Sequence, residues 1–168
     1  RTHNVVVANL AVESGDSAVG IARRTQYLDE IVERARAIPG VTAVGVSDAE
    51  PFSGGSSNGT FIVLANSSLH LSSASLEKDF ELMLRDKAQT GYGDYTLASG
   101  DYFRALHIPL VSGRLFTDDD RPGAPEVAIV NSALAKKQWP GESALGKVIE
   151  FGNIDGDLTP MTVVGVVG

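Results

Sequence analysis

Residues 4–47, NVVVANLAVESGDSAVGIARRTQYLDEIVERARAIPGVTAVGVS, decide the fold class of this chain. Within them, residues 18–38 carry apolar side chains at helical spacing opposite a row of charged ones, which predicts an amphipathic helix. The β-branched runs 4–12 and 41–47 are typical of strands, and Pro39-Gly40 ends the helix before the second of them. The order strand, helix, strand predicts a βαβ unit whose two strands lie side by side and parallel.

The rest of the chain alternates short strands with short helices. Strands are predicted for TFIVLA (60–65), DYTLAS (94–99), EVAIV (126–130), KVIEFG (147–152) and MTVVGVVG (161–168), the last two as a hairpin with a long loop. Helical turns are predicted for LEKDFELMLRDK (76–87), for DYFRALHIP (101–109) before its proline, and from Asn131 or Ser132 to Trp139. The fold class is therefore mixed α/β.

The glycine- and serine-rich segment PFSGGSSNG, residues 51–59, separates two parts of the chain. We expect residues 1–52 to form the βαβ half of one lobe and residues 53–168 to form a second, mixed α/β lobe. Backbone freedom at the glycines makes the segment a candidate hinge between lobes, although a static surface loop has the same composition.

Composition excludes several classes of function. The net charge of −7 repels phosphate backbones, and lysines and arginines are scattered, which argues against nucleic acid as a partner. The absence of cysteine removes disulfides, thiolate metal sites and cysteine nucleophiles. The longest apolar runs are shorter than the ~20 residues that a membrane-spanning helix needs.

No catalytic constellation emerges from the serines. Gly55-Ser56-Ser57-Asn58-Gly59 fits the letters of a nucleophile elbow, but a strand follows Ser57 where the elbow needs a helix. Ser47 follows a strand, yet Glu50-Pro51 blocks the helix. The S-x-x-K match at Ser75 has no companion motif and is typical of a helix start.

The candidate metal ligands and acid–base residues also lack partner residues at a suitable spacing in the sequence. His3, His70 and His107 show no ligand spacing, and the DGD around Asp155 lacks the rest of a calcium loop. Asp118, Asp119 and Asp120 could offer oxygens to calcium, but a solvated turn after Phe116 is the usual explanation of such a run. Glu50 and Asp101 could pair as acid and base only if the fold brought them together. The triplets at Asn58 and Asn66 fit the glycosylation pattern and mark loops at most. We therefore predict no catalytic, cofactor or metal residue, and no cofactor.

Four blocks carry a resemblance to a known family: IPGVTAVGVSDAEPFSGG (38–55), GDYFRALHIPLVSGRLFTDDD (100–120), EVAIVNSALAKKQWPGESALGKVIEFG (126–152) and TVVGVVG (162–168). In order and spacing they resemble the extracytoplasmic core of MacB-like (FtsX-like) ABC-transporter permeases, especially large orphan permeases of soil bacteria. The blocks cover well over half of the chain. The stretch from Ser67 to Gly93 departs from the family pattern, and nothing is transferred to it.

The resemblance implies a fold and a role. Residues 1–52 look like the first half of the porter lobe of such permeases, and residues 53–168 look like the sabre lobe. Because the chain starts at Arg1 and stops inside an apolar run at Gly168, we expect a segment of a longer protein, cut before a second porter half. A membrane helix is then expected just upstream of Arg1 and three more beyond the domain.

The implied function is non-catalytic. Such a domain lies in the periplasm and couples ATP-driven movement of the parent's membrane helices to a substrate or a periplasmic partner protein. Its expected partners are those membrane helices, an ATP-binding subunit and, as one further candidate, a second copy of itself. Two alternatives remain: a soluble extracytoplasmic ligand-binding or sensor module, and a serine hydrolase that would rest on Ser57 alone.

Overall fold

The chain folds into two compact units in a computed structural model that describes residues 4–10, 18–50, 57–64, 90–99, 101–121, 123–151 and 159–168. The first unit comprises Arg1–Gly55 and Thr96–Ile108, and the second comprises Ser56–Tyr95 and Pro109–Gly168. The chain therefore passes from one unit to the other three times, and residues 96–108 belong with the N-terminal unit. The mixed α/β class predicted from the sequence is confirmed.

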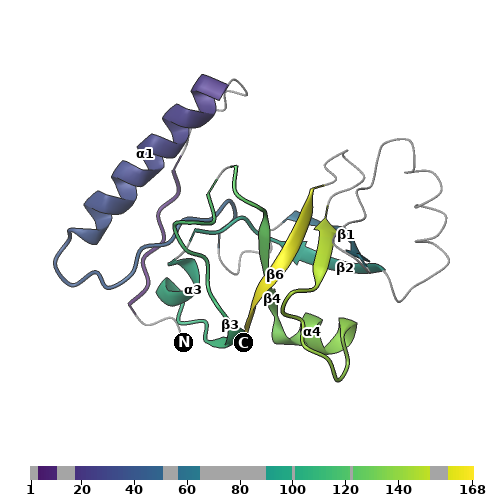
Figure 1. Ribbon diagram of the computed structural model, residues 1–168. Helices are drawn as coiled ribbons and strands as arrows, with labels where there is room; N and C mark the ends of the chain where they lie inside the picture. Colours follow the sequence, from purple (N-terminus) through teal and green to yellow (C-terminus); the bar gives the residue numbers. More distant parts are fainter. Residues whose placement is uncertain are drawn as a thin grey trace. The chain divides into compact units, whose positions relative to one another are not determined.

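The first unit contains helix α1, Ala18–Arg36, close to the predicted bounds (Figure 1). Two arginines in its last turn, Arg34 and Arg36, complement the carbonyl end of the helix. Gly40 then takes a φ of 91°, which glycine adopts at no steric cost. The short helix α3, Tyr102–Ala105, forms in the predicted segment and stops before Pro109.

In the described residues, the parallel strand pair expected on either side of α1 is not formed. Residues 5–10 and 41–46 are assigned to no strand, and the side chain of Val6 is 92% exposed. The segment after α1 instead meets residues 97–99 in antiparallel fashion, through a bridge between Ser47 and Ala98. The hydrogen bonds that join them run from Asp48 N to Leu97 O (3.2 Å) and from Ser99 N to Val46 O (2.9 Å). A strand pattern in sequence forms a ladder only where a partner is available.

In its described residues, the second unit is a six-stranded sheet with one helix. Its elements are β1 (Ser57–Leu64), β2 (Thr90–Tyr95), β3 (Leu110–Gly113), β4 (Val127–Asn131), α4 (Ser132–Gln138), β5 (Val148–Phe151) and β6 (Pro160–Val167). The sheet order is β2-β1-β5-β6-β3, and β4 also pairs with β6. Every pair is antiparallel except β4 with β6. Because β4 pairs along most of β6, β5 and β3 occupy successive parts of the opposite edge of β6.

Helix α4 forms where the sequence predicts a helix, and it packs on one face of this sheet. The side chain of Asn131 caps it by accepting a hydrogen bond from Leu134 N (2.7 Å). Trp139 follows the helix and is buried against the sheet. The core on this face consists of Phe61, Val130, Trp139, Ala144, Ile149, Val163 and Val166.

The opposite face of the sheet also buries side chains. Because neighbouring residues of a strand point to opposite faces, Ile62, Val148 and Glu150 lie across from the α4 side. Ile62, Leu64 and Val148 form a second apolar cluster, and Glu150 beside them is 1% exposed. Both faces of the sheet are therefore covered.

Strand β2 differs from its predicted position. DYTLAS (94–99) was expected to form a strand after a helix ending at TGYG, whereas the ladder covers residues 90–95. Residues 97–99 leave it because they pair with residues 46–48 of the first unit. The predicted helix at 76–87 and the loop between β5 and β6 lie outside the described residues.

The structure describes only residues 57–59 of the candidate hinge segment 51–59. Ser57, Asn58 and Gly59 belong to β1 and pair with Tyr95, Asp94 and Gly93, so these three residues are part of the sheet. The division between units falls after Gly55, within the predicted segment. Residues 51–56 are outside the described part of the chain, and a hinge there stays a prediction.

Candidate functional site

The serine candidates lie in ordinary backbone positions. Ser57 starts β1 opposite Tyr95, and β1 continues for eight residues with no helix after the serine, so the strand–turn–helix context of a nucleophile elbow is missing. The hydroxyl of Ser47 donates a hydrogen bond to Ala49 O (2.6 Å). Ser75 is outside the described residues. Neither described serine is placed as a nucleophile.

Of the three consecutive aspartates, Asp120 is engaged in an ion pair. Its Oδ2 and Oδ1 accept hydrogen bonds from the Arg114 guanidinium at 2.6 and 2.8 Å, and Oδ2 also accepts one from Thr117 N at 2.8 Å. These contacts, with that of Arg114 the strongest, lower the pKa of Asp120 from 3.8 to about 2. Asp118 and Asp119 are exposed beside it. The arrangement is a turn closed by a bidentate arginine–carboxylate pair.

Asp101 connects the two helices of the first unit. Its carboxylate lies 3.2 Å from the guanidinium of Arg36, at the end of α1, and 3.3 Å from that of Arg104, in α3. Arg36 also pairs with Glu33 at 2.9 Å. Two cations around one carboxylate explain the position of Asp101 structurally.

The remaining candidates are dispersed. His107 is exposed and takes a φ of 57° after α3, while His3, His70, Asn66 and Asp155 lie outside the described residues. Asn58 accepts a hydrogen bond from the hydroxyl of Tyr92 (2.6 Å). Within the described ranges, no three histidine, aspartate or glutamate side chains gather in a group that could hold a metal ion.

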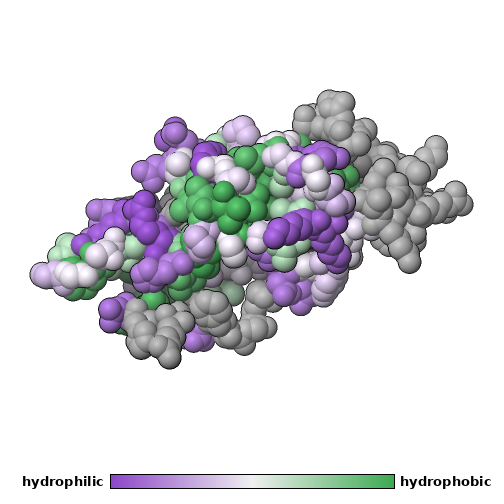
Figure 2. All heavy atoms as spheres, turned by 90° about the horizontal axis from the view of Figure 1, so that it is seen from below, coloured by the Kyte–Doolittle hydropathy of each residue, from purple (hydrophilic) through white to green (hydrophobic). Residues whose placement is uncertain are grey.

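The surface that stands out belongs to the first unit. None of its described residues is buried, whereas the second unit buries two apolar clusters. Most of the exposed large apolar side chains are in the first unit: Val6, Val7, Leu10, Val19, Tyr27, Ile38, Val41 and Leu97. Figure 2 shows hydrophobic side chains exposed on the surface next to hydrophilic ones.

Helix α1 contributes a regular apolar row to this surface. Leu28, Ile31, Val32 and Ala35 recur at helical spacing, and all four are half-buried. We call these four residues the α1 stripe. An amphipathic helix gains stability by burying such a stripe, and exposed apolar area of this kind marks interaction sites on soluble domains. The sequence identifies the stripe from its spacing, but spacing cannot tell how far the fold covers it.

The described charged and titratable side chains of this unit lie in ordinary electrostatic environments. The charged side chains near the stripe pair among themselves, as Glu30 does with Arg34 at 3.6 Å. Burial raises the pKa of the Tyr102 hydroxyl above its ordinary value of 10.0, with a smaller contribution from the negative charge of Asp48. A tyrosine kept neutral in this way is no stronger an acid or nucleophile than usual.

Comparison with known proteins gives consistent matches. The family described as "MacB-like periplasmic core domain" matches residues 4–168. A curated relative, "Probable export ATP-binding/permease protein MacB" from Pseudomonas entomophila (strain L48), is 36% identical over 69 residues, which make up 40% of this chain and 10% of that protein.

Two solved structures align with much of this chain at low sequence identity. The periplasmic region of MacB from Actinobacillus actinomycetemcomitans aligns over 81% of this chain and 49% of that one, with a TM-score of 0.47 and 18% identity. The extracellular domain of the noncanonic ABC-type transporter YknZ from Gram-positive bacteria aligns over 83% of this chain and 56% of that one, with a TM-score of 0.45 and 19% identity. The chain thus spans about half of these solved domains.

Proposed function

The chain belongs to the MacB-like periplasmic core domain family, and from this premise we propose that it couples movement of a permease's membrane helices to events in the periplasm. It is the periplasmic core domain of an ABC-transporter permease. No helix among the described residues is long and apolar enough to cross a bilayer. The membrane helices and the ATP-binding subunit that would drive the movement are proposed partners, contributed by other parts of the complex.

The observation that carries the proposal is the contrast between the two units. The second unit closes its own core around Phe61 and Val163, which are 0% and 1% exposed. The first unit leaves the α1 stripe only partly buried and the strand-like segments 5–10 and 41–46 without a ladder. A unit with an incomplete core is suited to join other parts of its protein.

We assign one occupant to this surface: a second α/β half of the same lobe, supplied by the parent polypeptide. The curated MacB relative is about ten times longer than the segment that aligns with it, which leaves ample chain for such a half. In this assignment the first unit is one half of a porter-like lobe and the second unit is the sabre-like lobe. The proposed mechanism is mechanical and uses no catalytic residue of this chain.

The reactivity of introduced cysteines tests whether a second half covers the α1 stripe, because the chain has no native cysteine. Ile31→Cys on the α1 stripe is compared with Asp29→Cys, an exposed position of the same helix. Both variants are labelled with a maleimide in the isolated domain and in the intact parent protein. We expect Ile31→Cys to react at least tenfold more slowly in the intact protein, and Asp29→Cys to react equally fast in both. Equal rates at Ile31→Cys in the two preparations would show that nothing covers the stripe.

A further inference from the structure

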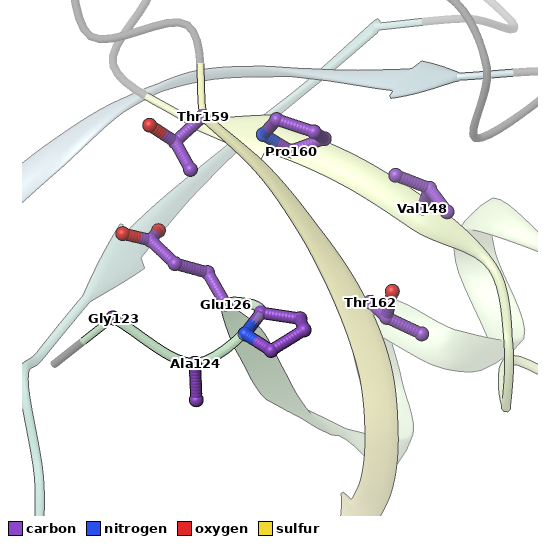
Figure 3. A pocket seen from close by; sticks show the side chains of 8 residues that line it. Gly123, Ala124, Glu126, Val148, Thr159, Pro160 and Thr162 are labelled. Carbon is purple, nitrogen blue, oxygen red and sulfur yellow. The ribbon is translucent and has the colours of Figure 1, made fainter. Parts of the chain in front are cut away.

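A pocket of about 460 Å³ opens on the second unit, where β4 and β6 begin and Val148 starts β5 (Figure 3). Its lining includes Pro125, Glu126, Val148, Thr159, Pro160 and Thr162. The volume lies within the range of pockets that hold small organic molecules. No residue discussed so far as a functional candidate lines it.

The sheet fixes the walls of the pocket. Thr162 of β6 pairs with Val148 on one side and with Val127 on the other, so three strands meet at this position. The backbone N–H of Thr162 donates a hydrogen bond to the carbonyl of Glu126 at 3.0 Å, which anchors the residue before β4 to β6. Val148 is 6% exposed and gives the pocket an apolar, rigid wall.

Glu126 gives the pocket its charge. It is the single ionisable side chain among the described residues of the lining, and its carboxylate extends from the start of β4 toward Thr159 in Figure 3. Within the described part of the chain, no lysine, arginine or histidine forms an ion pair with it. The negative net charge of the chain, −7, adds to the attraction for a cation.

The lining combines apolar and charged side chains. Val148, Pro125 and Pro160 offer carbon surface, Thr159 and Thr162 carry hydroxyl groups, and the Glu126 carboxylate points toward Thr159. A ligand that satisfies both needs a compact apolar body and one positive charge. The Glu126 carboxylate would repel an anion, and a purely apolar molecule would form no ion pair with it.

We propose that this pocket binds organic monocations with a compact apolar body, and that Glu126 is their countercharge. This site goes beyond the mechanical role proposed above and does not depend on it. Because Glu126 is exposed, its contribution is small and the affinity is in the millimolar range. The carboxylate therefore serves mainly to favour cations over other ligands, while the walls of the pocket contact the apolar body of the ligand.

A matched pair of probes tests the proposal by NMR titration of the ¹⁵N-labelled 168-residue chain. 1-Adamantanamine is a cation at neutral pH, and 1-adamantanol has the same apolar body without the charge. We expect saturable amide shifts at Glu126, Val148 and Thr162 with the amine, and a Kd about threefold higher for the alcohol, as one exposed charge pair implies.

Two variants complete the test. Glu126→Gln should bring the two probes to equal affinity while the spectrum of the folded chain is retained. Asp94→Asn removes the same charge from exposed β2, outside the pocket, and should keep the preference for the amine. The proposal is overturned by non-saturable shifts, by equal binding of the two probes to the unmodified chain, or by equal loss of preference in the two variants.

Discussion

The ring of Phe61 fills the space that a β-carbon on Gly91 would occupy on the neighbouring strand β2. The two residues pair directly in the β1–β2 ladder, and Phe61 is 0% exposed. The glycine therefore makes room for the largest fully buried side chain of the second unit. The same relationship explains why TGYGDY is a strand in spite of two glycines, a composition that normally weakens strands.

Gly91→Ala should destabilise the second unit by about 1–3 kcal/mol, because the new methyl group overlaps the Phe61 ring. Gly93→Ala is the matched control in the same strand, since its β-carbon would lie 3.9 Å from Phe61 Cε1, an ordinary contact. Urea unfolding followed by the fluorescence of Trp139, the single tryptophan, measures both. Similar midpoints for the two variants would mean that Phe61 moves aside at little cost.

Asp120→Asn should remove a pH-dependent contribution to stability. The folded pKa of Asp120, about 2, lies below its ordinary value of 3.8, so the ion pair stabilises the fold fully above that value and loses this contribution as the pH falls toward 2. We expect a loss of about 1 kcal/mol at pH 7, limited because the Arg114 side chain is 45% exposed. Urea unfolding at pH 7 and pH 2.5 tests this, with Asp118→Asn as the exposed control. A variant that is destabilised equally at both pH values would contradict the assignment.

Gly45→Ala should loosen the first unit and leave the second unchanged. A β-carbon at Gly45 would lie 2.7 Å from Tyr102 N and closer still to Tyr102 Cα, and a backbone neighbour cannot move aside easily. Amide exchange at Val46, Asp48 and Ser99, whose N–H groups hold the two segments together, should accelerate about tenfold for each 1.4 kcal/mol lost. The Trp139 unfolding midpoint serves as the internal control. A shift of that midpoint would show that the units do not unfold independently.

Calcium should leave the melting temperature of the chain unchanged. Both oxygens of Asp120 are taken by Arg114, which leaves only the exposed Asp118 and Asp119 of the three. A site occupied at a hundred times its Kd would stabilise the native state by about 2.7 kcal/mol, which calorimetry detects readily. A rise in melting temperature at millimolar calcium, lost in a triple asparagine variant, would count against the ion-pair account.

Local signals in the sequence were sufficient for part of the fold. The apolar spacing of α1 and the Asn131 cap of α4 depend on neighbours three or four residues away, and both helices formed near their predicted bounds. The position of β2 depends on Phe61, about thirty residues distant, so no local pattern reveals it. Segments 5–10 and 41–46 have strand composition but no ladder in the structure, because pairing requires a partner strand.

The candidate site was less accessible to sequence reasoning than the fold. The spacing of the α1 stripe predicted an amphipathic helix, and only the structure reveals that its four residues stay partly exposed in the first unit. Glu126 has no motif around it, since the pocket arises where the starts of β4 and β6 come together. The sequence shows Asp118 to Asp120 as a run of charges. It does not show which of the three pairs with Arg114, because that depends on the turn between Arg114 and Asp120.

The central claim is that this domain couples movement of membrane helices to events in the periplasm. If the segment between the two units is a hinge, this coupling changes the distance between the units during the ATP cycle, and distance measurement in the intact transporter tests it most directly. Spin labels at Asp29→Cys on α1 and Lys137→Cys on α4 report on the first and second units, and a control pair at Asp94→Cys and Lys137→Cys lies within the second unit. Pulsed electron resonance then gives each distance distribution without nucleotide and with ATP trapped. The account predicts a changed distribution between the units and an unchanged one for the control pair. Identical distributions for both pairs, in a transporter that still hydrolyses ATP and exports substrate, would contradict it.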